Sequence, residues 1–276
     1  MCLIAFALNA RADRPLLIAA NRDEHLDRPT QPLHGWRLPA GTPVVAGRDR
    51  HAGGTWLGAT PSGRIAMLTN VREWPVAVDN ADLSRGELVT GWLDGSLDWA
   101  GFAQDVDGQR YNGFNLVVGD LTQGQWAWLS NRGGARAGEL VAQALGDGVY
   151  GLSNAALDTP WAKTVQLKSA VQQSLAVPAD WRQPLLDALL DETKAAAQEL
   201  PHTGAPRAWE QALSSPFVDY AERRYGTRSS TLVNLSARGL ELEEWTHQRP
   251  EPVAPEPGRE RWPLARSHYR RMLISM

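Results

Sequence analysis

Cysteine is almost absent from this sequence, because Cys2 is the single one among 276 residues. One thiol excludes an internal disulfide and any zinc or iron–sulfur centre built from several cysteines. Long apolar runs are absent too, since none approaches the ~20 residues that span a bilayer. The apolar start of the chain has no basic segment before it, which argues against a secretory signal. We therefore expect a soluble, cytoplasmic protein.

An excess of charge of one sign is also lacking, since 28 basic and 31 acidic residues give a formal net charge of −3. No basic stripe indicates a nucleic-acid partner, and no acidic tail indicates a cationic one. The sequence has no phosphate-binding loop and no regular alternation of strands with helices, which disfavours a doubly wound nucleotide-binding fold. We expect a small-molecule ligand or substrate, and neither a metal nor a cofactor.

Apolar runs near the start predict a hairpin of two strands. Residues 2–8 and 15–20 are almost continuously apolar, and a turn-rich link over 9–14 joins them. Strands that are apolar throughout are covered on both faces, as in a layered α/β/β/α arrangement. Further strands are expected at 43–46, 55–59, 64–69, 114–118, 125–129, 148–152, 229–235 and 239–246.

Helix signals lie between the early and the late strands. A capping box over 84–87 predicts a short helix, a proline after a threonine predicts one over 159–175, and a leucine stripe predicts another over 185–190. This order favours mostly antiparallel sheets of the α+β class, in one domain over 1–248. Five prolines interrupt residues 249–276, which we expect to form a loosely ordered tail.

The position of Cys2 points to a chemical role. Initiator methionine is removed most readily before a small residue, which would leave Cys2 with both a thiol and a free α-amine. An α-amine has a pKa of about 7.7–8.0 and accepts protons near neutral pH, so it would activate the thiol as a nucleophile. The alternative is a small buried hydrophobe that begins the first strand.

Polar residues at strand ends are candidates for the same site. Antiparallel pairing of the hairpin would place residues 21–24 beside Cys2. Arg22 would then stabilise a thiolate, and Asp23 would orient the α-amine, although a strand-end ion pair and turn is the alternative. Asparagines at later strand ends would donate to a developing oxyanion or only stabilise turns. The remaining candidates are Asn21, Trp56, Asn70, Arg72, Asn154 and Arg228.

Eight motifs, in order along residues 1 to about 235, resemble those of the NRDE family, which includes the eukaryotic Transport and Golgi Organization proteins. They are Met1-Cys2-Leu3-Ile4, Asn21-Arg22-Asp23-Glu24, Gly54-Thr55-Trp56-Leu57-Gly58, Leu68-Thr69-Asn70-Val71-Arg72, Ser84-Arg85-Gly86-Glu87-Leu88, Asn112-Gly113-Phe114-Asn115-Leu116, Leu152-Ser153-Asn154 and Tyr225-Gly226-Thr227-Arg228-Ser229-Ser230.

This family is similar to the N-terminal nucleophile hydrolases, particularly bile-salt hydrolases and penicillin V acylases. The resemblance implies a four-layer αββα sandwich and hydrolysis of a non-peptide C–N bond in a small acylated molecule, through a thioester at Cys2. It also implies that Arg22 poises the thiolate, Asp23 holds the amine and Asn154 donates to the oxyanion. Arg228 would complete the charge network or bind a substrate carboxylate. Substrate contacts are expected from Asn21, Trp56, Asn70 and Arg72.

One spacing departs from the hydrolase pattern, in which the arginine and the aspartate lie three residues apart. Arg22 and Asp23 are adjacent here, and adjacent side chains on a regular strand point to opposite faces. Only one of the two is then expected to meet Cys2, unless the strand ends or bulges there.

A carrier of haem or acyl lipids on the same scaffold is the alternative function. The resemblance implies it, because eukaryotic members of the family are implicated in haem mobilisation and acyl-CoA homeostasis. The haem propionates would meet Arg22, Arg72 and Arg228, and the candidate axial ligands are Cys2, His25 and His51.

Overall fold

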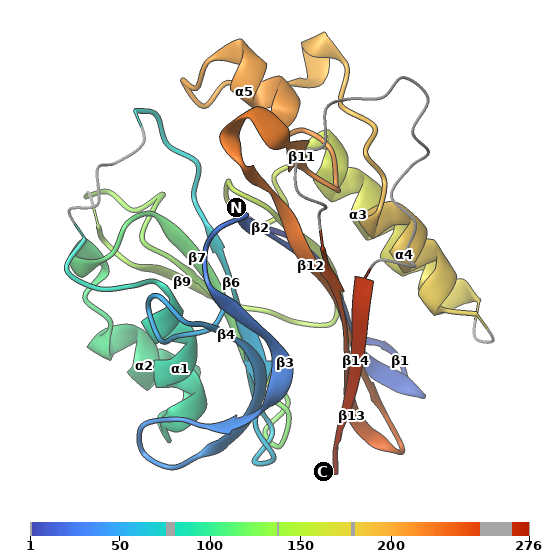
Figure 1. Ribbon diagram of the computed structural model, residues 1–276. Coiled ribbons are helices and arrows are strands. Elements are labelled where there is room, and N and C mark those ends of the chain that lie inside the picture. The colour runs from blue at the N-terminus through green and yellow to red at the C-terminus, as the bar shows by residue number, and fades with distance from the viewer. Residues whose placement is uncertain (1, 76–80, 137, 178–179, 249–266, 276) are drawn as a thin grey trace.

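Two facing antiparallel sheets with helices on both outer sides form the body of the protein (Figure 1). This computed structural model describes residues 2–75, 81–136, 138–177, 180–248 and 267–275. The layer order confirms the expected α+β class and the four-layer αββα sandwich.

The first sheet contains the hairpin that begins the chain, and its order is β10-β1-β2-β12-β13-β14, with the short β11 beside β12. Every pairing in it is antiparallel. Its strands are β1 (Cys2–Arg11), β2 (Arg14–His25), β10 (Gly148–Leu152), β11 (Asp219–Tyr220), β12 (Tyr225–Ser236), β13 (Gly239–His247) and β14 (Ser267–Ile274).

The second sheet is a meander, because its strands lie side by side in chain order. They are β3 (Thr30–Arg37), β4 (Pro43–Asp49), β5 (Leu57–Ala59), β6 (Arg64–Asn70), β7 (Phe114–Asp120), β8 (Gln125–Ser130) and β9 (Val141–Ala144).

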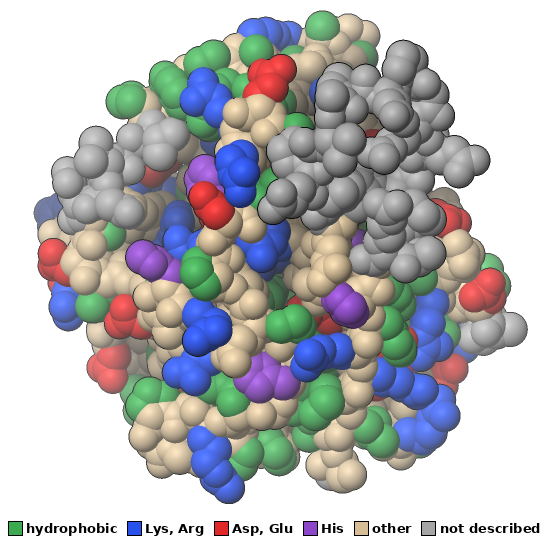
Figure 2. Space-filling view, in the orientation of Figure 1, with side chains coloured by type: hydrophobic (Ala, Val, Ile, Leu, Met, Phe, Trp, Pro, Cys, Tyr) green, Lys and Arg blue, Asp and Glu red, His purple; other side chains and the backbone are tan. Residues whose placement is uncertain are grey.

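Helices cover the outer face of each sheet, and charged side chains of both signs are interspersed over the described part of the face that Figure 2 shows. The helix α1 (Gly86–Asp94) packs on the second sheet with α2 (Trp99–Asp105) beside it, and α3 (Ala162–Ala176) and α4 (Arg182–Leu189) cover the first. The short α5 (Arg207–Ala212) lies above one end of the sandwich (Figure 1). The described residues also form the single-turn 3-10 helices η1 (Gly108–Arg110), η2 (Ala197–Glu199) and η3 (Ala221–Arg223).

The apolar first strand is buried on both faces. Ile4 and Phe6 point into the core between the two sheets, whereas Leu3 and Ala5 pack beneath α3 and α4. This alternation follows from the two-residue period of a strand. Cys2 has the parity of Ile4 and Phe6, so its side chain faces the space between the sheets.

The expectation of a loosely ordered tail is wrong for the last strand. β14 pairs with β13 from Leu240↔Ile274 to His247↔Ser267. Polar side chains of β14 interact with buried acids of β13. Arg271 forms an ion pair with Glu241, and the Tyr269 hydroxyl donates to Glu243 over 2.7 Å. Arg271 and Tyr269 therefore fasten this strand to its neighbour. The proline-rich part, 249–266, lies outside the described residues.

Candidate active site

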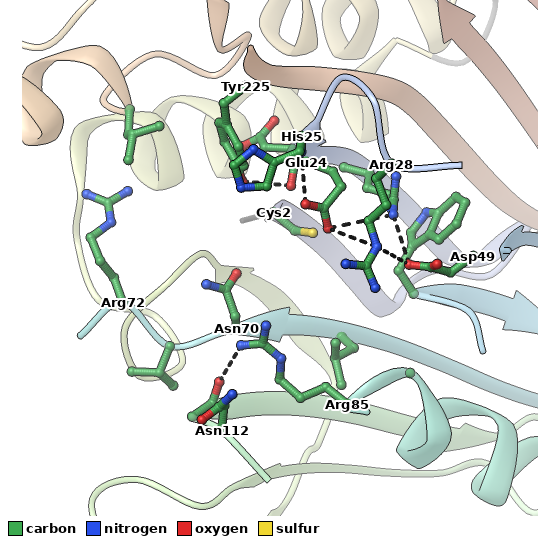
Figure 3. A pocket seen from close by; sticks show the side chains of 18 of the residues that line it. Cys2, Glu24, His25, Arg28, Asp49, Asn70, Arg72, Arg85, Asn112 and Tyr225 are labelled. Atoms are coloured by element: carbon green, nitrogen blue, oxygen red, sulfur yellow. Dashed lines mark hydrogen bonds and ion pairs between the residues drawn. The ribbon is translucent and has the colours of Figure 1, made fainter. Parts of the chain in front are cut away.

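A cavity of about 650 Å³ opens between the two sheets where β1 begins (Figure 3). Its wall includes Cys2 and Arg22 from the first sheet and Asn70 from the end of β6. Trp209 of α5 also lines the cavity. The cavity thus combines a thiol, cationic and amide groups and apolar surface.

Cys2 and Arg22 share one face of the hairpin, because β1 and β2 pair them directly. The buried Arg22 guanidinium lies 4.2 Å from the centroid of the Trp56 ring, which fixes its orientation. It also lies 3.5 Å from the Asp49 carboxylate and 3.7 Å from Glu24. Two carboxylates therefore share the Arg22 charge near the thiol.

Asp23 also borders the cavity, but its carboxylate belongs to the opposite face of β2. Asp23 Oδ1 accepts a hydrogen bond of 2.7 Å from the Thr227 hydroxyl, and the Tyr225 hydroxyl donates to the Asp23 carbonyl over 2.8 Å. Burial raises the pKa of the Asp23 carboxyl, while the Lys163 ammonium on α3 acts to lower it. Arg22 and Asp23 thus point to the two sides of the strand, as the parity argument predicted.

The Cys2 thiol is half-buried, and its pKa is raised above the ordinary value of a thiol. Burial raises its pKa most, and the negative charge of Asp23 raises it further. Arg22 and the backbone N–H of Asp23 act in the opposite direction. Reaction at Cys2 therefore needs a base that removes the thiol proton.

Asn70, rather than Asn154, presents its amide to the cavity (Figure 3). Asn154 is buried behind it and donates from Nδ2 to the Asn70 backbone carbonyl over 2.9 Å and to Asn70 Oδ1 over 3.2 Å. Because Asn70 Oδ1 accepts, its Nδ2 is oriented away from Asn154. The neighbouring Ser153 hydroxyl donates to the Cys2 carbonyl over 3.2 Å. The loop after β10 thus anchors both Cys2 and Asn70.

Besides Asn154, two further expected site residues lie outside the cavity wall. Asn21 has the parity of Asp23 and donates to the backbone carbonyls of Leu189 and Pro216 over 2.7 and 2.9 Å, so it joins β2 to the helix layer. Arg228 occupies a bulge in β12 and donates to the His25 and Arg28 carbonyls over 2.8 and 3.0 Å. Its guanidinium therefore holds the turn after β2, and neither Asn21 nor Arg228 is among the residues that line the cavity.

Arg72 lines the cavity and forms an ion pair with Glu210 of α5, with both side chains buried. The Thr203 hydroxyl also donates to Glu210. This carboxylate is a residue that sequence reasoning missed, since a single glutamate in a six-residue helix carries no signal of burial. The pair fastens α5 to the loop after β6 and so closes the cavity.

Further polar residues missed from the sequence line the cavity, among them Arg28 and Arg85. Arg28 pairs with Asp49 over 2.6 Å, and Arg85 donates to the Gly113 carbonyl over 3.2 Å. Of the candidate haem ligands, Cys2 and His25 border the cavity, whereas His51 is exposed outside it. Within the described part of the chain, no group of three or more His, Cys, Asp or Glu could hold a metal ion, and no helix is long and apolar enough to cross a membrane.

The two facing sheets, their outer helices and a cavity at the first residue of β1 define the fold of the N-terminal nucleophile hydrolases. A solved Caenorhabditis elegans N-acylethanolamine-hydrolyzing acid amidase ortholog shares this fold, with a TM-score of 0.52 and 11% sequence identity. The match covers 84% of this chain and 92% of that one.

Sequence comparison then identifies the family. The model of the family described as Transport and Golgi organisation 2 matches residues 1–246. Two similar proteins are the Transport and Golgi organization 2 homologs of Mus musculus and Homo sapiens, each 33% identical over 263 and 258 residues respectively. Each match covers 87% of this chain and 90% of the relative. The chain belongs to the Transport and Golgi organisation 2 family.

Proposed function

We propose that this protein is an amidohydrolase that cleaves a non-peptide C–N bond of a small acylated molecule through a thioester at Cys2. The observation that carries the proposal is the meeting of three groups at one cavity: the Cys2 thiol, the Arg22 guanidinium paired with it, and the Asn70 amide. These are the nucleophile, the cation and the oxyanion donor that acyl transfer requires.

The mechanism begins when removal of Met1 frees the α-amine of Cys2. That amine takes the thiol proton, and the sulfur attacks the amide carbonyl of the substrate. Asn70 Nδ2 donates to the oxygen that gains negative charge. The tetrahedral intermediate then expels the leaving amine, which the α-ammonium protonates, and a thioester remains. Water, deprotonated by the α-amine, attacks the thioester and releases a carboxylic acid and the thiol.

The walls of the cavity support an apolar acyl group as part of the substrate. Trp209 contacts Trp74 and Tyr220 with ring centroids 5.4 and 6.1 Å apart, and all three border the cavity. Such a wall would bury an alkyl chain or ring. The charged groups Glu24, Arg28 and Asp49 line the other wall and would face the polar leaving amine.

Two mass measurements test this proposal. Intact mass of the purified protein should show loss of Met1. After incubation with an N-acyl amide or a p-nitrophenyl acyl ester and an acid quench, the mass should increase by one acyl group in the wild type and not in Cys2→Ala. Hydrolysis by Cys2→Ala at the wild-type rate, or retention of Met1, would refute the proposed mechanism.

A haem or acyl-lipid carrier is the second candidate, because the thiol, an imidazole and several guanidinium groups all border one cavity. Titration of the protein with haem, followed by absorbance, separates the two. A Soret shift that disappears in Cys2→Ala or His25→Ala would support a haem carrier. No spectral change at micromolar protein would exclude haem as the ligand.

A further inference from the structure

Lys163 is a buried lysine that the mechanism above does not use. It is the second residue of the 15-residue α3, and only 2% of its surface is exposed. Its Nζ makes no hydrogen bond with any described residue. Burial of an ammonium without hydrogen bonds is costly, and the positive end of the helix dipole adds to the cost. The burial of Lys163 at this position therefore costs free energy, which argues against a purely structural role.

Four charged or titratable groups act on Lys163, each from a different element. They are Asp23 on β2, Cys2 on β1, Arg72 after β6 and Glu210 on α5. Burial is the largest cause that lowers the pKa of Lys163, to about 8, and Arg72 lowers it further, whereas the other three raise it. Arg72 and Glu210 already pair with each other. Among the charges that act on the Asp23 carboxylate, the Lys163 ammonium is the strongest.

This arrangement answers a difficulty in the proposed chemistry. A buried carboxylate beside the α-amine of Cys2 would hold that amine as an ammonium ion, which is unable to take a proton from the thiol. A second cation on the far side of Asp23 reduces this effect, because it compensates the carboxylate charge. Lys163 lies on the helix side of the first sheet, where Asp23 points.

We propose that Lys163 is a positioning residue whose ammonium compensates Asp23 and so keeps the α-amine of Cys2 unprotonated and able to accept the thiol proton. The inference rests on the proposed function, since it assigns the amine the role of base. Lys163 does not line the cavity and forms no hydrogen bond with the thiol, so in this proposal it acts through Asp23.

The single cysteine makes a direct titration feasible. Protein labelled with 13C-cysteine and released from a cleavable tag with Cys2 first would give one Cα and one Cβ resonance, which report the amine and the thiol separately. We expect a wild-type Cα midpoint at or below the ordinary amine value of about 7.7–8.0. In Lys163→Met the midpoint should rise by about one pH unit, and Lys163→Arg should restore it.

Lys168→Met is the matched control, because Lys168 lies on the same helix but pairs with Asp158 at the surface. Its Cα midpoint should equal that of the wild type. An unchanged midpoint in Lys163→Met would overturn the inference. A wild-type Cα midpoint more than about one pH unit above the ordinary amine value would also overturn the inference. This second test uses the wild-type protein alone and does not depend on the folding of a variant. Because the N-terminus is made by cleavage, retention of Met1 in the natural protein would refute the proposed function and leave this titration interpretable.

Discussion

Asn154→Ala is the substitution that best tests whether the oxyanion donor is Asn154, as the resemblance implies, or Asn70, whose amide faces the cavity. The resemblance assigned donation to Asn154, whereas Asn154 is buried and its Nδ2 donates twice to Asn70. If Asn70 is the donor, then Asn154 only orients it, and Asn70→Ala should lower kcat more than Asn154→Ala does.

The expected magnitudes follow from these contacts. Asn70→Ala removes the donor itself, and loss of one such donor costs about 10²–10³-fold in kcat. Asn154→Ala removes two neutral hydrogen bonds of 2.9 and 3.2 Å behind the donor. Each is worth about 0.5–1.5 kcal/mol, and only the part that positions the Asn70 amide reaches the transition state. We therefore expect a loss of about 5–30-fold for Asn154→Ala, with KM nearly unchanged in both variants.

The assay is release of p-nitrophenol from p-nitrophenyl acyl esters in the pre-steady state, which reports acylation of Cys2 without the natural substrate. Urea denaturation of both variants provides the control for folding. A loss in Asn154→Ala equal to or greater than that in Asn70→Ala would refute the reasoning and restore Asn154 as the donor. Asn154→Asp extends the test, since it keeps the shape and removes both N–H donors.

Three further perturbations test other contacts. Glu210→Leu should lower the free energy of unfolding by about 3–5 kcal/mol, because it leaves Arg72 without its buried carboxylate; a loss below about 1 kcal/mol in urea would contradict this. Burial raises the pKa of Glu244, so its contribution to stability is full below the unfolded-state pKa and is lost as pH rises through the folded-state pKa. Glu244→Gln should therefore gain stability relative to wild type between pH 4 and pH 7, measured by urea denaturation, and an equal difference at both pH values would exclude this. Trp209→Ala should slow acylation by long-chain esters several-fold more than by the acetyl ester, and equal losses would place the acyl group elsewhere.

The hairpin and its consequences were predictable because they depend on local patterns. Continuous apolar runs at 2–8 and 15–20 indicated strands covered on both faces, and the two cores around β1 confirm it. Antiparallel pairing then brought Arg22 beside Cys2 with no tertiary information. The capping box over 84–87 likewise placed the start of α1, where Ser84 N donates to the Glu87 carboxylate over 3.0 Å.

The buried charges were not predictable, because they depend on segments far apart in the sequence. Lys163 and Glu210 lie on short stretches whose polar composition is typical of exposed helices. Their burial arises only when α3 packs on the first sheet and α5 meets the loop after β6. The contacts of Arg228 were not predictable for a related reason, since this residue lies in a bulge of β12 that interrupts the regular register.

The adjacent spacing of Arg22 and Asp23 has the same effect on side-chain direction as the three-residue spacing of the hydrolase pattern. A strand alternates its side chains with a period of two residues, so any odd separation places two residues on opposite faces. A separation of three does this, and so does the separation of one between Arg22 and Asp23. Here the cation shares the cavity face with Cys2, while the carboxylate points to α3 and Lys163. The parity, rather than the distance along the chain, is what places the Arg22 side chain on the thiol side of β2 and the Asp23 carboxylate on the other side.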